Sequence, residues 1–185
     1  GPTYNEHAAA FQAHGWDVGL HGIAQVVVNP NNPDGRHWTT NDLTGDLRII
    51  DESFCDVTPD VSLMAQAARP GTVILKSFGK FWGLAGLRLG FAIATPETTE
   101  ALAGMLGPWP VSGPALETGT AALNATQWAE ATRARLDDDA ARLRLHHSYP
   151  TRSSTVSQIM AAILVPSNRS ISRRPVGEVT LISVR

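Results

Sequence analysis

The sequence predicts an α/β fold, a three-layer α/β/α arrangement around a mostly parallel sheet. Along residues 1–145, short apolar runs alternate with helical patterns, which is the order of elements in parallel α/β proteins. The apolar runs are rich in Val, Ile and Leu, as are strands buried inside such a sheet. Polar clusters follow three of these runs, at the sheet edge where ligands bind in α/β folds. The 185 residues, 43% of them hydrophobic, suffice for one domain with its own core.

Four strands are expected, each ending at polar or turn-forming residues. They span residues 25–28, 47–50, 72–75 and 89–94. Because the carboxyl ends of parallel strands meet at one edge of a sheet, the polar loops that follow the first three strands should converge there. These loops are residues 29–35, 51–56 and 77–80.

Helical spacing predicts a helix over residues 6–14, ended by Gly15, and another over 96–106. An Ala-rich stretch predicts one long helix over 114–145. Residues 40–47 have room for a short helix between the first two strands.

The composition divides the chain into two regions, 1–145 and 146–185. Residues 1–150 carry 10 basic and 16 acidic side chains, whereas residues 151–185 carry five Arg, one Glu and seven Ser. The helical pattern stops near Leu145 without a cap or turn signal, so we interpret the basic tail as frameshifted or disordered sequence unrelated to the domain. The chain also begins without Met, and we expect a domain that is incomplete at both ends.

Charge and composition exclude several classes of function. A net charge of −2 argues against a protein held on nucleic acid by charge alone, and no run of 18 apolar residues could span a membrane. The single cysteine, Cys55, excludes an internal disulfide framework and suggests a reducing, cytoplasmic location. It is expected to be a small buried side chain rather than a nucleophile. The adjacent His146 and His147 cannot converge on one metal from a single helix face, so no metal site is expected.

The first polar loop has the sequence Asn-Pro-Asn-Asn-Pro-Asp-Gly at residues 29–35. Its two prolines fix φ, and Gly35 is free to take a positive φ. The loop could be no more than a tight strand connection, or its rigid side-chain amides could hold a ligand.

The other two loops contain the groups with acid–base chemistry. Asp51 could cap a helix, or it could be a carboxylate kept charged by a cationic partner such as a protonated ring nitrogen. Lys76 and Lys80 are the only lysines, against 13 Arg, which favours a requirement for an amine that can deprotonate. Such a lysine can form a Schiff base. Ser77 and Arg88 could both bind a phosphate.

Taken in order, these segments resemble fold-type-I pyridoxal-phosphate (PLP) enzymes of the class I/II aminotransferase family. Within it they are most similar to the decarboxylases that act on threonine phosphate in cobalamin biosynthesis, which are related to histidinol-phosphate aminotransferases. The segments are the 29–35 loop, Asp-Glu-Ser-Phe at 51–54, Ser-Phe-Gly-Lys-Phe-Trp-Gly-Leu-Ala-Gly-Leu-Arg-Leu-Gly-Phe at 77–91, Gly-Pro-Trp-Pro-Val-Ser-Gly-Pro-Ala at 107–115, and residues 128–143.

The resemblance implies pyridoxal 5'-phosphate as cofactor and assigns a role to each candidate residue. Lys80 would form the Schiff base, Asp51 would pair with the pyridine nitrogen, Asn32 would bond the ring hydroxyl, Tyr4 would stack on the ring, and Ser77 and Arg88 would hold the phosphate. Lys80 and Asp51 are thus the expected catalytic residues. An intact relative would be a homodimer acting on a small phosphorylated amino acid, without nucleic acid or membrane partners.

Two departures from the family pattern bear on the reaction. Phe54 stands where many aminotransferases have a Tyr that reaches the ring hydroxyl, which favours decarboxylation over transamination. Only 15 residues separate Gly35 from Asp51, so the helix of that crossover must be short. The arginine for the substrate carboxylate would follow Leu145 in the family, and the tail does not match that region, so the substrate site is expected to be incomplete.

Three functions therefore stay open. The resemblance favours PLP-dependent decarboxylation of L-threonine O-3-phosphate to aminopropanol phosphate. One alternative is a histidinol-phosphate-type aminotransferase. The other is a non-catalytic remnant or interaction module.

Overall fold

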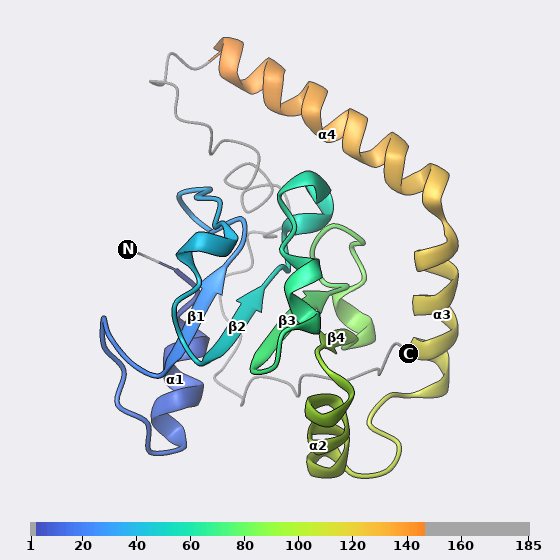
Figure 1. The fold of residues 1–185 in the computed structure, drawn as a ribbon. Helices are drawn as coiled ribbons and strands as arrows, with labels where there is room; N and C mark the ends of the chain where they lie inside the picture. Colours follow the sequence, from blue (N-terminus) through green and yellow to red (C-terminus); the bar gives the residue numbers. More distant parts are fainter. Residues whose placement is uncertain (1–2, 147–185) are drawn as a thin grey trace, which may run out of the picture.

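A computed structural model describes residues 3–146 as a four-stranded sheet with helices around it (Figure 1). The strands are β1 (Ala24–Val28), β2 (Leu47–Asp51), β3 (Thr72–Ser77) and β4 (Gly90–Ile93), in that spatial order. β1, β2 and β3 run parallel, and β4 pairs antiparallel with β3. This confirms the predicted α/β fold with a mostly parallel sheet. The predicted tail, 146–185, lies outside the described residues except for its first residue.

The three parallel strands end level with one another. Val28 lies opposite Asp51, and Asp51 lies opposite Leu75. The ladder continues one bond further on each side, since Asn29 N–H donates to the Asp51 carbonyl and Glu52 N–H donates to that of Leu75, both at 2.8 Å. The loops after these strands therefore leave from the same edge, as the sequence predicts.

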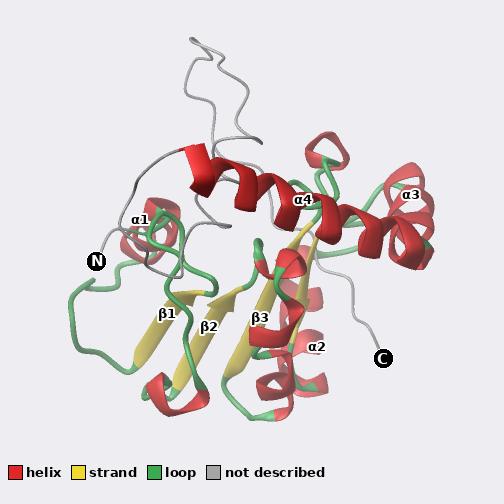
Figure 2. Cartoon of the chain, turned by 90° about the horizontal axis from the view of Figure 1, so that it is seen from above, coloured by secondary structure: helices red, strands yellow, loops and turns green. Residues whose placement is uncertain are grey.

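Within residues 3–146, four α-helices surround the sheet: α1 (Asn5–Ala13), α2 (Pro96–Leu106), α3 (Gly113–Asn124) and α4 (Thr126–His146). The first two match their predicted ranges closely. α4 crosses the edge where the parallel strands end, while α2 lies toward the opposite end of the sheet (Figures 1 and 2).

The prediction of one helix over 114–145 is wrong, because the chain turns at Ala125 between α3 and α4. Asn124 competes for a backbone acceptor, donating from its side chain to the Thr120 carbonyl at 3.0 Å. The two helices also bury different surfaces. Gly119 of α3 packs on Leu89, and a Cβ there would clash with the Leu89 side chain, whereas α4 packs on the loops after β2 and β3. Alanine patterning does not encode this change of direction.

The crossover between β1 and β2 contains only a short 3₁₀ turn, η1 (Thr40–Asp42), in place of a helix over 40–47. Asp42 accepts bonds from the Thr39 N–H and hydroxyl, which closes a capping box. The N–H groups of Asp46 and Leu47 both donate to the Ile23 carbonyl, so the chain joins the sheet before a helix could continue.

Three buried clusters form the core. One packs Val27, Ile50 and Ile74 of the central strands against Leu43, Leu63 and Ala67 of the turns. A second joins Phe54, Val57 and Phe81 to Ala129 and Leu136 of α4. The third contains Phe78, Leu89 and Phe91. The second cluster attaches α4 to two of the three loops that carry the predicted site. No helix among residues 3–146 has the length and apolar character needed to cross a bilayer.

Candidate active site

Asp51 is a buried carboxylate at the last position of β2, only 7% exposed. Its Oδ1 accepts bonds from the Ser53 N–H at 2.9 Å and the Ser53 hydroxyl at 2.6 Å, and its Oδ2 lies 2.8 Å from His7 Nε2. Burial by itself would raise the pKa of this carboxyl, but the bonds from His7 and Ser53 outweigh it and hold the pKa below the ordinary value. Asp51 is therefore a carboxylate that stays charged at neutral pH.

His7, on α1, is not among the residues that the sequence predicts for the site. It follows Tyr4 by three positions at the start of a helix, and the two rings meet edge to face with centroids 5.4 Å apart. That spacing places both on one helix face and is the one signal available in the sequence. The sequence alone does not show which strand this helix face contacts.

Tyr4 lies beside the same carboxylate with half of its surface exposed. The pKa of its phenol is raised, first by burial and then by the negative charges of Glu6 and Asp51, while the positive charge of Arg88 lowers it. The structure thus brings Tyr4, Asp51 and Arg88 within electrostatic reach of one another, from three distant parts of the sequence.

The asparagines of the first loop are used differently. Asn29 is fully buried; its amide donates to the Val61 carbonyl at 2.8 Å and accepts from the Trp38 N–H at 3.1 Å. Asn31 donates to Asp34 and accepts from the Thr3 hydroxyl, both at 2.7 Å. Asn32 is half-buried, and no hydrogen bond joins its side chain to another residue within 3–146. Asn29 and Asn31 hold the loop together, and Asn32 has its amide available to a ligand.

The third loop carries Ser77, Lys80 and Arg88. The Ser77 hydroxyl accepts from the Gly79 N–H at 3.0 Å, which tightens the turn before Lys80. Lys80 Nζ lies 5.3 Å from the centroid of the Phe54 ring. Arg88 is exposed and takes a left-handed conformation, with φ of 53°, directly after the turn η5 (Ala85–Leu87).

The second lysine has different surroundings. Lys76 Nζ lies 3.3 Å from Asp56 Oδ1 and 3.9 Å from Glu52 Oε2. Burial, aided by the charge of Glu52, raises the pKa of Asp56 despite the nearby Lys76. Lys76 therefore belongs to a buried cluster of charges, separate from the Asp51 site.

Glu52 and Cys55 are buried side chains with structural roles. Glu52 accepts from the Leu63 N–H at 2.6 Å and the Ser62 hydroxyl at 2.8 Å, which fixes the 62–63 turn against the end of β2. Burial, and next the charge of Glu52, raise the pKa of the Cys55 thiol to about 12. Cys55 is 1% exposed, which confirms that it is a small buried side chain.

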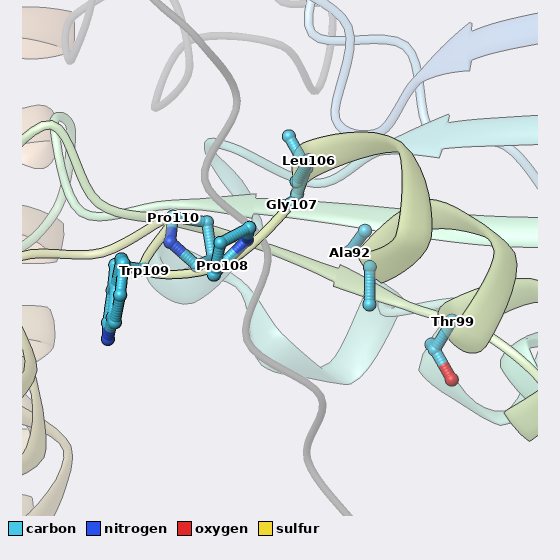
Figure 3. A pocket seen from close by; sticks show the side chains of 8 residues that line it. Ala92, Thr99, Leu106, Gly107, Pro108, Trp109 and Pro110 are labelled. Carbon is cyan, nitrogen blue, oxygen red and sulfur yellow. The ribbon is translucent and has the colours of Figure 1, made fainter.

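Two cavities lie beside the sheet. One of about 190 Å³ is formed by β4, α2 and the loop after α2, and it is lined by Ala92, Thr99, Ala103 and residues 106–110 (Figure 3). Another of about 200 Å³ includes Asp56, Lys76, Ser77, Trp82 and Leu123 in its lining. Of the predicted site residues, only Ser77 borders either cavity. Within residues 3–146 no cluster of three or more His, Cys, Asp or Glu has a metal-binding arrangement.

Comparison with known proteins matches residues 22–149 to the family model described as aminotransferase class I and II. Threonine-phosphate decarboxylase from Sinorhizobium sp is 43% identical over 136 residues, covering 63% of this chain and 40% of that protein. The Pseudomonas aeruginosa enzyme of the same name is 42% identical over 146 residues, covering 68% and 44%. Histidinol-phosphate aminotransferase from Blochmanniella pennsylvanica is 38% identical over 106 residues, covering 52% and 30%. The chain thus spans less than half the length of these curated relatives.

Solved structures show the same fold. Histidinol-phosphate aminotransferase from Sinorhizobium meliloti, in complex with pyridoxal-5'-phosphate, aligns with a TM-score of 0.63 at 22% identity, over 80% of this chain and 42% of that one. L-threonine-O-3-phosphate decarboxylase from Porphyromonas gingivalis aligns with a TM-score of 0.60 at 20% identity, over 83% and 55%.

Proposed function

Because the chain belongs to the class I and II aminotransferase family, we propose that it carries the cofactor-binding part of a pyridoxal-phosphate-dependent carboxy-lyase. The proposed reaction converts L-threonine O-3-phosphate to aminopropanol phosphate and carbon dioxide, a step in cobalamin biosynthesis. The observation that carries it is the 42–43% identity to threonine-phosphate decarboxylases over 136 and 146 residues. The family model matches residues 22–149, which include every predicted site residue except Tyr4.

The described residues fit the chemical groups of pyridoxal phosphate. The Asp51 carboxylate, kept charged by His7 and Ser53, suits a protonated pyridine nitrogen. The uncommitted amide of Asn32 suits the ring hydroxyl, and the half-exposed ring of Tyr4 suits the cofactor face. The Ser77 hydroxyl and the Arg88 guanidinium suit the phosphate.

When bound, the cofactor supplies a sink for the electron pair left on the substrate's α-carbon after carbon dioxide departs. The chain's own residues prepare that chemistry. The Lys80 amine would hold the cofactor covalently. Asp51 keeps a proton on the ring nitrogen, and His7 holds the Asp51 carboxylate in place. Tyr4 fixes the ring plane, and Arg88 with Ser77 anchors the phosphate.

Several finer assignments belong to the same proposal. The substrate is a small phosphorylated amino acid, as the names of the relatives suggest. An intact relative acts as a homodimer, by resemblance to the family. The protein works in the cytoplasm, which the single cysteine supports, because it leaves the chain without an internal disulfide.

A histidinol-phosphate-type aminotransferase is the second candidate, favoured by relatives of 30–38% identity. In that reaction the Lys80 amine would move a proton from the substrate α-carbon, and a 2-oxo acid would be required. Phe54 favours the decarboxylase, because its ring has no phenol to offer the cofactor hydroxyl.

The cofactor role is tested by incubating the chain with pyridoxal phosphate, reducing with borohydride and mapping the adduct by peptide mass. One adduct on Lys80, lost in Lys80→Ala, supports the proposal. Equal labelling of Lys76 and Lys80, or no labelling, contradicts it. Release of carbon dioxide from threonine phosphate without 2-oxoglutarate by a full-length relative then separates the decarboxylase from the aminotransferase.

A further inference from the structure

The Lys80 amine rests against an aromatic face. Its Nζ lies 5.3 Å from the centroid of Phe54, a side chain that is only 8% exposed. No Asp or Glu within residues 3–146 forms an ion pair with Lys80, whereas Lys76 lies near two carboxylates. The two lysines of the chain are therefore held by different physical interactions.

Phe54 is fixed by the core on its other side. It packs in one buried cluster with Val57, Phe81, Ala129 and Leu136. The last two belong to α4, so this helix helps to hold the ring in place. Its backbone begins the turn η2 (Cys55–Val57), three residues after Asp51. The same short segment thus sets the position of the Asp51 carboxylate and of the ring that contacts Lys80.

An aromatic face attracts an ammonium group but offers it no hydrogen-bond acceptor of the usual kind. A carboxylate in the same place would hold the amine as a fixed ion pair, as Asp56 holds Lys76. A ring instead limits where the amine can go and leaves its lone pair, once the proton is lost, free to react.

We propose that Phe54 is a positioning residue for Lys80, its ring face holding the Nζ amine in place on the loop after β3. The role in catalysis rests on the proposed function, while the positioning itself concerns only the two side chains. Phe54 therefore has a use of its own at the place where the family commonly has Tyr.

The presence of only two lysines makes a direct test possible. Reductive methylation with ¹³C-formaldehyde gives each ε-amine two labelled methyl groups and keeps its positive charge. Lys80→Arg assigns the signals by removing one of them. The ring current of Phe54 should move the Lys80 methyl signal upfield of the Lys76 signal. Phe54→Leu should return it to the position of a free lysine, and Phe54→Tyr, which keeps the aromatic face, should preserve the shift.

Cofactor labelling gives the second readout. The rate of pyridoxyl labelling at Lys80 should fall about twofold or more in Phe54→Leu, because the amine is no longer held in one place, and should recover in Phe54→Tyr. Val57→Ala perturbs the same cluster without touching Lys80, and it should leave the Lys80 signal in place. Circular dichroism and thermal melting confirm that each variant is folded.

The outcomes separate the two proposals. A Lys80 signal that is the same in the parent and Phe54→Leu overturns the positioning role, whatever the labelling shows. A shift that depends on Phe54 without any adduct supports the positioning role and contradicts the proposed cofactor function. Equal shifts from Phe54→Leu and Val57→Ala would mean that Phe54 acts only through general packing, and would overturn the inference.

Discussion

The two ends of β2 each bury a charged side chain, and they do so in opposite ways. Toward the amino end, Arg48 is 4% exposed and donates to the Thr72 hydroxyl and to the carbonyls of Gly45 and Pro70. At the carboxyl end, Asp51 accepts from Ser53 and from His7, a titratable side chain on a separate helix. The acceptors around Arg48 belong to the sheet and the loops that join its strands. One of the two partners of Asp51 is instead the side chain of a separate helix.

The difference separates a charge that holds the sheet together from one that we propose binds the cofactor. Both charges are buried and hydrogen-bonded, so burial alone does not separate them. The two charges differ in the groups that surround them. Near Asp51 lie His7 and the half-exposed ring of Tyr4, whereas the Arg48 guanidinium joins three backbone or hydroxyl oxygens that belong to the sheet and its loops.

Arg48→Met should have the largest effect on stability. It leaves the buried Gly45 carbonyl, the buried Thr72 hydroxyl and the partly buried Pro70 carbonyl without their donor, which should lower the free energy of unfolding by about 3 kcal/mol or more. Urea unfolding measures this, with the exposed Arg36→Met as control. A loss below about 1 kcal/mol would contradict the structural role.

Asp51→Asn should have the largest effect on the cofactor. The change keeps the shape of the side chain but removes its charge, so pyridoxal phosphate should bind about tenfold more weakly or worse. Fluorescence titration measures the affinity, and Asp60→Asn, at an exposed position, is the matched control. Unchanged affinity would place the cofactor ring elsewhere.

His7→Gln should have a smaller effect that depends on pH. Because the pKa of Asp51 is held below its ordinary value of 3.8, its hydrogen bonds stabilise the fold above that pH, and this contribution is lost as the pH falls through the folded-state pKa. Removing His7 should cost about 1 kcal/mol near neutral pH and flatten the acid dependence. Urea midpoints from pH 3 to 7 test this, and parallel curves for parent and variant would disprove it.

Asn32→Ala should change stability least, by under about 0.5 kcal/mol, because its amide has no partner among residues 3–146. The matched variant Asn29→Ala should cost about 2 kcal/mol, since it removes the bonds to Val61 and Trp38. Weaker cofactor binding is expected from Asn32→Ala despite its normal stability. A clear loss of stability there would assign Asn32 to the scaffold.

The sequence predicted the parts of the fold that depend on local pattern. The strands, α1 and α2 follow from runs and spacing, and the meeting of three loops follows from parallel strands of similar length. The break at Ala125 depends on which core surface each helix buries, a long-range property that alanine content does not encode.

The site was predictable only where motifs carried it. Asp51, Lys80 and Arg88 belong to segments that resemble the family, and their assigned roles remain proposals. His7 depends on α1 contacting the end of β2, and the Phe54–Lys80 contact depends on α4 supporting the ring. Both contacts join elements that are far apart in the sequence, so neither spacing nor composition could indicate them.

The adjacent acids Asp51 and Glu52, at the end of β2, lie in different surroundings. Successive side chains on an extended strand point to opposite faces, so these two carboxylates enter different environments. Burial, and after it the charge of Glu52, raise the pKa of Asp56 and of the Cys55 thiol, while hydrogen bonds from His7 and Ser53 outweigh burial and lower that of Asp51. A slip of β2 by one residue would exchange the two acids and place the wrong one beside Tyr4. The accuracy of strand pairing during folding thus decides which of the two acids lies at the proposed site.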